Sequence, residues 1–330
     1  MTVHPQSPTA GASLAQDAPH IIAITPNPAL DVTVTLEQLV VGNTHRIPAA
    51  GAKVAGKGVN VATVAAEQGY PAVLLGPLAP EEHRYATWRG WLDQVSRLGI
   101  AQLFSPTTAP LRSTYAIHET KHGDASIINE RGSAHPQETW EHLLNTVREQ
   151  VNQHPGSVVT VSGSWPPETP VSVLESIIAL AHSAGARVVV DCAGEFLTAA
   201  AAAGADVLKP NRAELAETVG FDDPVRGARE LLNRGAGAVI VSCGAAGLYW
   251  ITPTESQHGA VETVLAGNPT GAGDALVSAV ATALLEQLPI AAALERAVAW
   301  SAAAVLQPVA GCIGTAWKDL QVRTAAVPQP

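Results

Sequence analysis

Aromatic residues and clustered positive charge are both scarce in this chain of 330 residues. Phe, Trp and Tyr together make up 4% of it, whereas 47% of the residues are hydrophobic, which suits a globular protein whose helices pack closely on a sheet. The formal net charge is -10, and Lys and Arg form no run. Because nucleic acids are bound mainly through clustered cations, nucleic acid is not an expected partner.

Cysteines and long apolar stretches are also few. Cys192 and Cys243 each end an apolar run, and with Cys312 they form no CxxC pair, so we predict buried free thiols and a reducing, cytoplasmic compartment. The His residues lack metal-ligand spacing, so no zinc site is expected. No apolar stretch reaches the roughly 18 residues that span a bilayer, and residues 1–19 are typical of a disordered tail, so no membrane partner is expected.

Short apolar runs alternate with longer helical stretches from residue 20 onward. The predicted strands are Ile21–Thr25, Ala72–Gly76, Val158–Ser162, Arg187–Asp191, Asp206–Lys209 and Ala238–Ser242. The predicted helices are Val59–Gly69, Glu82–Leu98, Gln137–Asn152, Pro170–Ala184, Glu214–Val219, Pro224–Arg234, Ala272–Leu288 and Ala291–Leu306. This alternation indicates βαβ units, so we expect one α/β domain over residues 20–320 with a mostly parallel sheet, followed by a C-terminal tail at 321–330.

Two stretches, Asp31–Ile47 and Leu103–Asn129, break this alternation. Within them Val32–Leu36 and Ser113–Ile117 alternate between polar and apolar residues, which predicts half-exposed strands. We therefore expect a small appendage to the main sheet, placed as a lid over a cleft.

The strongest local motif is NPTGAGD at residues 268–274, which precedes a long apolar helix. Gly271, Ala272 and Gly273 allow a tight turn that presents consecutive N–H groups beside a helix N-terminus. Such a loop can hold phosphate oxygens, and Asp274 in the first helical turn can take a proton from a hydroxyl. The simpler alternative is that Asp274 only caps the helix.

A second motif, KPNRAE at residues 209–214, follows a predicted strand and opens a helix. Asn211 and Glu214 are three residues apart and therefore share one helical face. One carboxylate and one amide oxygen suit a hydrated magnesium ion. A capping pair at an ordinary helix start explains the same spacing.

The turn SCGAAG at residues 242–247 follows another apolar strand. Its glycines, Gly244 and Gly247, allow the backbone to approach a flat or charged ligand, although a plain hairpin turn fits as well. No GxxxxGK[ST] phosphate-binding loop occurs in the chain.

Two motifs near the N-terminus carry groups that suit a polyhydroxylated ligand. Asp31 ends the segment NPALD and can accept hydrogen bonds from two hydroxyls, or it is a turn aspartate. In the later segment AGKGVN, Gly56 permits close backbone approach, Lys57 can meet a phosphate, and Asn60 can bind a hydroxyl. The alternative for Lys57 is a solvated loop lysine.

Taken together and in this order, these segments resemble those of the ribokinase-like (phosphofructokinase-B) carbohydrate kinases, above all the 1-phosphofructokinase and tagatose-6-phosphate kinase branch. The resemblance runs from about Ile21 to about Ala316. It implies a three-layer α/β/α fold with a mostly parallel central sheet and a small β-strand lid at about 31–50 and 103–130. It also implies a homodimer formed through the lid.

The resemblance further implies a reaction in which ATP, with Mg2+, phosphorylates a sugar phosphate. Fructose 1-phosphate is the favoured acceptor, and tagatose 6-phosphate or fructose 6-phosphate is the alternative. Asp274 would be the catalytic base and Gly271, Ala272 and Gly273 the anion hole. The remaining roles would fall to Asn211 and Glu214 for magnesium, to Lys209, Asn211, Ser242, Gly244 and Gly247 for the nucleotide, and to Asp31, Arg46, Gly56, Lys57, Asn60, Arg112 and Ser162 for the acceptor.

The chain departs from the family pattern at Ala55, at Trp165, at Cys192 with Ala193, and at residues 44–45. All of these lie on the acceptor side, so the reaction type is better determined than the sugar. A non-catalytic sensor on the same fold would lack the base or the magnesium residues, which are present. A dinucleotide oxidoreductase would need GxGxxG after the first strand, where this chain has NPA.

Overall fold

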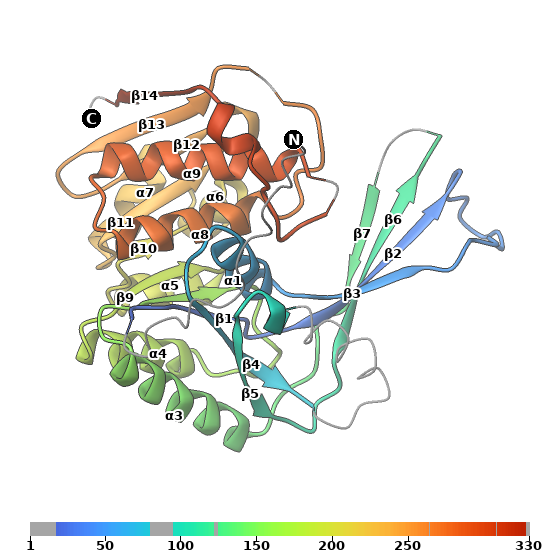
Figure 1. Ribbon diagram of the computed structural model, residues 1–330, viewed down its shortest axis with the longest axis horizontal. Coiled ribbons are helices and arrows are strands. Elements are labelled where there is room, and N and C mark those ends of the chain that lie inside the picture. The colour runs from blue at the N-terminus through green and yellow to red at the C-terminus, as the bar shows by residue number, and fades with distance from the viewer. Residues whose placement is uncertain (1–17, 80–94, 122–124, 264, 308, 328–330) are drawn as a thin grey trace, which may run out of the picture.

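The computed structural model describes residues 18–79, 95–121, 125–263, 265–307 and 309–327. These residues form a layered body and a lid that projects from it (Figure 1). Within the described ranges, no helix is both long enough and apolar enough to cross a bilayer.

The body is built on one ten-stranded sheet with the order β14-β13-β12-β11-β10-β9-β8-β1-β4-β5. The pairs from β11 to β5 are parallel and the three pairs from β11 to β14 are antiparallel. The strands are β1 Ile21–Ile24, β4 Ala72–Leu78, β5 Ala101–Pro106, β8 Val158–Ser162, β9 Arg187–Asp191, β10 Val207–Leu208, β11 Ala238–Ser242, β12 Leu248–Ile251, β13 Ser256–Val261 and β14 Val322–Ala326.

Helices cover both faces of this sheet, which confirms the predicted three-layer α/β/α class (Figure 1). The side chains of β1 alternate between two cores, with Ile21 and Ala23 in one and Ile22 and Ile24 in the other. The first core is covered by α1 Lys57–Glu67, α8 Ala272–Leu285 and α9 Ile290–Val305. The second is covered by α3 Gln137–Gln153, α4 Ser172–Ser183, α5 Glu195–Ala202, α6 Arg212–Val219 and α7 Pro224–Asn233.

The lid is a separate four-stranded sheet with the order β3-β2-β6-β7. Its strands are β2 Ala29–Leu36, β3 Gly51–Ala55, β6 Arg112–Glu119 and β7 Ala125–Asn129. The strands predicted at 32–36 and 113–117 lie inside β2 and β6, which pair in parallel. The predicted lid boundaries were wrong at two places: β3 lies beyond residue 50, and residues 103–106 belong to β5 of the main sheet.

The predicted C-terminal tail is also corrected by the structure, because Val322–Ala326 form β14 and pair antiparallel with β13. On its outer edge, the hairpin β12–β13 would have backbone N–H and C=O groups without hydrogen-bond partners, and β14 pairs with them. Most of the predicted helix Glu82–Leu98 and the N-terminal segment 1–17 lie outside the described residues. The cysteines are free, and Cys192 is buried as predicted, but Cys243 is only half-buried.

Candidate active site

Asp274 lies in the first turn of α8, at the carboxyl end of the parallel strands. The cap of α8 is Gly271, whose φ of 88° is left-handed, and no side chain caps the helix, so the simple capping role for Asp274 is wrong. The carboxylate is only 6% exposed, and its Oδ2 accepts a hydrogen bond of 2.7 Å from Nδ2 of Asn60 on α1. Two predicted motifs, 214 residues apart, thus meet directly.

The surroundings of Asp274 suit a proton acceptor. Burial raises the pKa of its carboxyl to about 7, while the nearby Lys57 lowers it and Asp191 raises it further. A base whose pKa lies near the working pH combines the correct protonation state with an adequate affinity for the proton. The hydrogen bond from Asn60 fixes the direction of the carboxylate, so the second oxygen can face a hydroxyl.

A buried ion cluster lies beside Asp274, and its centre is Asp191 at the end of β9. This carboxylate is fully buried and receives Nζ of Lys57 at 3.3 Å and Nζ of Lys209 at 3.1 Å. Burial alone would raise the pKa of Asp191, but Lys209 and Lys57 lower it overall, so the group is ionised. The lysines differ in access, since the Lys209 side chain is 4% exposed and the Lys57 side chain 41%.

Both lysines were predicted from their motifs, whereas no role was predicted for Asp191. The signal for Asp191 in the sequence is that a charged residue directly follows the apolar run Val188–Val190 of β9. A buried carboxylate normally needs a cation. The motif spacing alone did not show that the two lysines, 152 residues apart by their numbering, share it.

The glycine loop before α8 is held tightly from behind. A Cβ placed on Gly271 would lie 2.6 Å from Cβ of Ala310, and one placed on Gly273 would lie 3.6 Å from Nζ of Lys209. The first contact leaves no room for a side chain, and the second places an ammonium beside the loop. Backbone N–H groups, a helix N-terminus and a cation therefore converge where an anion can bind.

The predicted nucleotide motifs also converge. Asn211 and Ser242 are paired in a parallel bridge at the ends of β10 and β11. The turn after Ser242 forms a short 3-10 helix, Gly244–Ala246, and Gly247 follows with a φ of 89°. A side chain at Gly247 would collide with the backbone of Gly259, so the turn requires glycine.

Asn211 and Glu214 form a complete capping box at the start of α6. The Asn211 side chain accepts from the Glu214 N–H at 2.8 Å, and the Glu214 side chain accepts from the Asn211 N–H at 2.8 Å. The structural role is therefore real, but each side chain retains oxygen lone pairs. Glu214 also raises the pKa of Lys57, together with the larger effect of Asp191, so its charge is felt within the cluster.

On the lid, Asp31 is flanked by positive charge. Burial raises the pKa of its carboxyl, while Lys53 and Arg112 lower it and Thr114 donates a hydrogen bond to it. Lys53 was not among the predicted site residues. It lies directly opposite Asp31 in the β2–β3 pair, and this register could be recognised only once β3 was known.

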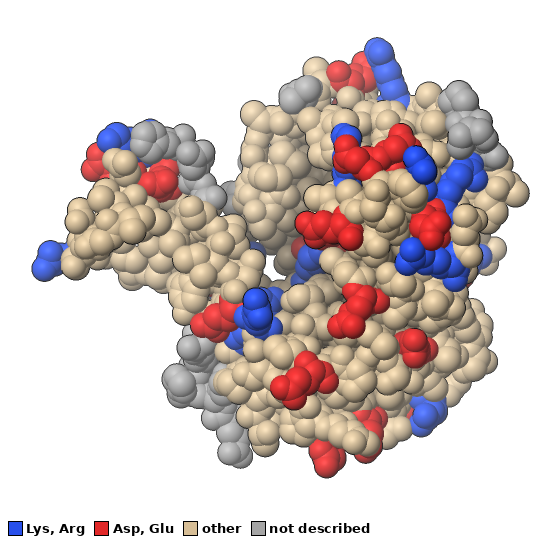
Figure 2. Space-filling model, turned by 180° about the vertical axis from the view of Figure 1, so that it is seen from behind, with Lys and Arg blue, Asp and Glu red and all other residues tan. Residues whose placement is uncertain are grey.

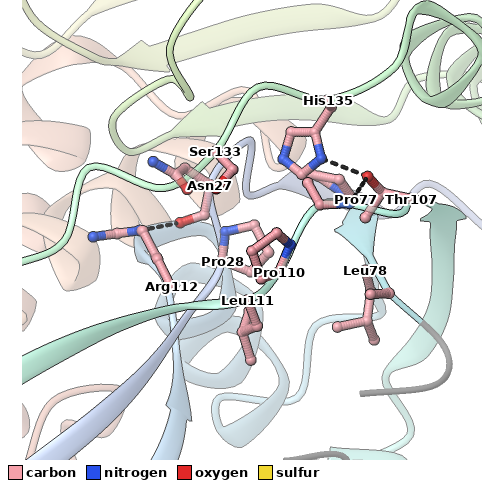
Figure 3. A pocket seen from close by; sticks show the side chains of 12 residues that line it. Asn27, Pro28, Pro77, Leu78, Thr107, Pro110, Leu111, Arg112, Ser133 and His135 are labelled. Atoms are coloured by element: carbon pink, nitrogen blue, oxygen red, sulfur yellow. Dashed lines mark hydrogen bonds between the residues drawn. The ribbon is translucent and has the colours of Figure 1, made fainter.

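Arg112 also borders a pocket at the base of the lid (Figure 3). Its Nε donates to the carbonyl of Asn27 at 3.1 Å, and Nδ1 of His135 lies 2.7 Å from the hydroxyl of Thr107. Burial lowers the pKa of His135 to about 4, so this imidazole is neutral near pH 7. The pocket is lined by Asn27, Pro28, Pro77, Leu78, Ala79, Thr107, Ala109, Pro110, Leu111, Arg112, Ser133 and His135.

Two further predicted acceptor residues differ in their surroundings. Arg46 is exposed in the β2–β3 connection and makes no ion pair within the described part of the chain. Ser162 is fully buried at the end of β8, next to Asp191 in register, and its hydroxyl has no hydrogen-bond partner among the described residues. Their roles stay predictions.

Figure 2 shows the lid standing away from the body, with a hollow between them and Lys or Arg atoms visible inside it. Gly56 caps the start of α1 with a φ of 141°, in close contact with Thr25, and this conformation lets the chain turn from β3 into α1. Asn60 of the acceptor-side motifs thus contacts Asp274, and Lys209 of the nucleotide-side motifs lies beside the glycine loop that precedes it.

Comparisons with known proteins agree with this geometry. The model of the pfkB family carbohydrate kinases matches residues 25–315. A 1-phosphofructokinase of Xanthomonas campestris is 30% identical over 279 residues, covering 80% of this chain and 84% of its own. A 1-phosphofructokinase of Escherichia coli is 27% identical, covering 88% and 92%.

Among solved structures, phosphofructokinase-2 from Escherichia coli in complex with fructose-6-phosphate superposes with a TM-score of 0.81. It is 26% identical, and the match covers 91% of this chain and 97% of that one. The family match spans most of the chain, including the lid, the ion cluster and the glycine loop. This chain therefore belongs to the pfkB family of carbohydrate kinases.

Proposed function

We propose that this kinase transfers the γ-phosphoryl group of ATP to fructose 1-phosphate and forms fructose 1,6-bisphosphate. The observation that carries the proposal is the buried carboxylate of Asp274 beside the glycine loop, fixed by Asn60 and with a pKa of about 7. The choice of acceptor is supported by relatives that are named 1-phosphofructokinase and that match along most of their length.

In this mechanism Asp274 removes the proton from the primary hydroxyl of the acceptor. The hydroxyl oxygen then attacks the γ-phosphorus, the bond to the leaving ADP oxygen breaks, and Asp274 keeps the proton. The N–H groups of Gly271 and Gly273 and the ammonium of Lys209 stabilise the charge on the transferred group. The Ala272 N–H donates to the carbonyl of Pro269 at 3.2 Å, so Ala272 contributes by shaping the turn. Lys57 supplies a cation that reaches the open side of the cluster.

Magnesium fits the residues present, in the manner of an ion held largely by phosphates and water. No group of three or more His, Cys, Asp and Glu side chains that could enclose a metal occurs among the described residues. Glu214 and Asn211 offer one carboxylate and one amide oxygen, which suit an ion that keeps most of its water ligands. The ion would neutralise phosphate charge during transfer.

For the acceptor, we propose that Asp31 and Asn60 orient the sugar hydroxyls while Lys57 and Arg112 meet its phosphate. Asp31 and Arg112 lie close enough for each to shift the pKa of the other, as burial also does. Arg46, which is exposed in the β2–β3 connection, stays a predicted further contact of this phosphate.

A homodimer through the lid is part of the proposal. The β2–β6 and β6–β7 registers place Val32, Tyr115 and Ile128 side by side on one face of the lid, with Val34 and Ile117 on the same face. These side chains are half-exposed, and Ile128 is 55% exposed. An apolar face of this kind is best covered by an equivalent face of a second subunit. The free cysteines also support a reducing compartment such as the cytoplasm.

The test of the base is Asp274→Ala. Loss of general base catalysis should lower turnover by about 10²–10⁴-fold, while MgATP still binds, because the loop and Lys209 remain. Steady-state kinetics and ATP titration measure the two effects separately. Asp223→Ala is the matched control, since this aspartate only caps α7 and its loss should leave turnover unchanged. Near-normal turnover of Asp274→Ala would reject the mechanism.

The acceptor is tested by measuring ADP release with fructose 1-phosphate, fructose 6-phosphate, tagatose 6-phosphate and unphosphorylated fructose. Fructose 6-phosphate is the second candidate, because the similar Escherichia coli phosphofructokinase-2 has been solved in complex with it. The highest kcat/KM with fructose 1-phosphate supports the proposal. A higher value with either 6-phosphate would assign the chain to that acceptor. ATP binding without turnover on any sugar would favour a sensor.

A further inference from the structure

Lys53 on β3 lies where the lid meets the body. It is the direct cross-strand partner of Asp31 in the antiparallel β2–β3 pair, so their Cβ atoms lie on the same face about 4.5–5.5 Å apart. Both side chains are half-buried. The positive charge of Lys53 therefore lies close enough to lower the pKa of Asp31, the carboxylate to which the acceptor role was assigned, against the larger effect of burial.

The same ammonium also reaches the body. Nζ of Lys53 donates a hydrogen bond of 3.2 Å to the carbonyl of Ala310, in the loop that follows α9. This loop supports the catalytic residues from behind: Ala310 packs on Gly271, and a Cβ on Gly311 would lie 2.8 Å from Oδ1 of Asn60. Through this loop, Lys53 is connected to the anion hole and to the partner of Asp274.

From these contacts we propose that Lys53 is a positioning residue that holds the acceptor carboxylate Asp31 in register with the loop behind Gly271 and Asn60. The inference rests on the proposed function, because it assigns Asp31 to acceptor binding. Lys53 acts on the acceptor through Asp31 and on the catalytic loop through Ala310. Its effect is thus expected on acceptor binding more than on ATP binding.

The experiment compares Lys53→Met with the wild type, using fructose 1-phosphate and MgATP. Methionine fills a similar volume without charge or donor, so the KM for fructose 1-phosphate should rise by roughly tenfold or more, as expected for a lost charged hydrogen bond. The KM for MgATP should stay within about twofold. Lys53→Arg keeps the charge and should recover most of the acceptor affinity.

The pH dependence separates an electrostatic role from simple packing. The charged groups that face Asp31 are Lys53 on β3 and Arg112 on β6, with Thr114 as hydrogen-bond donor and Glu130 acting on Arg112. Removal of the Lys53 charge should raise the pKa of Asp31. As the pH falls, Asp31 should therefore become protonated, and acceptor binding should be lost, at a higher pH in Lys53→Met than in the wild type. Lys53→Arg should restore the wild-type pH profile.

Lys121→Met is the matched control, because this lysine is also on the lid but donates only to Gln38 at an exposed position. It should change neither KM nor the pH profile. If Lys53→Met lowers the melting temperature, Lys53→Gln, which retains a donor for Ala310 but no charge, should still show the pH shift.

An unchanged acceptor KM, a parallel rise in the KM for MgATP, or an unshifted pH profile in Lys53→Met and Lys53→Gln would overturn the proposal for Lys53. Failure of the proposed function has a different signature. In that case the wild type itself would not turn over fructose 1-phosphate.

Discussion

Asp191 links two lysines and Asp274, the proposed catalytic base, in one electrostatic unit. Its negative charge holds the ammonium groups of Lys57 and Lys209 and, at the same time, raises the pKa of Asp274, after the larger effects of burial and Lys57. Conversion of a buried carboxylate to an amide leaves its partner cations without compensation. The charge of this residue should therefore influence the pH at which the enzyme works.

In the wild type, kcat should fall as the pH decreases below about 7, because Asp274 becomes protonated and can no longer accept a proton. In Asp191→Asn the negative charge that raises the pKa of Asp274 is absent, so this acidic limb should move to lower pH. The measurement is kcat as a function of pH with saturating substrates, together with the melting temperature of each variant.

Asp206→Asn serves as the control for this prediction. Asp206 accepts hydrogen bonds from the Val188 N–H and lies 2.9 Å from Nε2 of His182, away from the cluster. Its replacement should leave the acidic limb in place. An acidic limb that also stays in place in Asp191→Asn would show that Asp191 does not tune the base.

The roles of single residues were predictable where a short local motif carries them. They were missed where the role depends on a partner that is distant in the sequence. Asp274, Asn60 and Lys57 were identified from glycine-containing segments and the family resemblance. The role of Asp191 and the place of Lys53 depend on side chains that are far apart in the sequence. Arg46 was assigned from the order of the motifs. In the structure it lies between the end of β2 and the start of β3, and its side chain is exposed.

The N-terminus of α8 carries the proposed anion hole, so phosphoryl transfer should be sensitive to changes there. Gly271→Ala would add a Cβ at a φ of 88° and 2.6 Å from Cβ of Ala310. The left-handed conformation alone costs about 1–2 kcal/mol with a side chain. The clash should also displace the N–H groups of the loop, so kcat should fall by about 10²-fold, as for loss of an oxyanion donor.

Gly185→Ala provides the comparison, since Gly185 has a φ of 74° but nothing lies within 4 Å of its added Cβ. It should lose a similar amount of stability in chemical denaturation and keep its kcat. If both variants retained full turnover, the loop would not be the anion hole.

Among the elements, the buried parallel strands and their helices were predictable because their apolar runs are short and bounded by glycines. The helix α5, Glu195–Ala202, was missed because its alanine-rich run has no clear polar face. The strands β3 and β14 were missed because their outer residues are exposed, so they lack an apolar run. Both are edge strands whose conformation is set by a neighbour.

The apolar face of the lid predicts that the whole molecule is a dimer. Ile128→Glu introduces a charge into the apolar face of Val32, Tyr115 and Ile128, so a dimer formed there should dissociate. Sedimentation of the wild type should give the mass of two chains and that of the variant the mass of one. Leu98→Glu, at an exposed position of the body, should stay dimeric. A monomeric wild type would contradict the lid interface.

The strand order of the main sheet has a consequence for the newly synthesised chain. From β8 to β14 the strands follow one another outward in the order of the sequence, while β1, β4 and β5 occupy the opposite side. Once the first half of the chain has left the ribosome, each later strand meets its partner at an edge that is already present. The sheet can thus be extended in one direction during translation, and β14 covers the outer edge of β13, which shorter nascent chains leave open to mispairing.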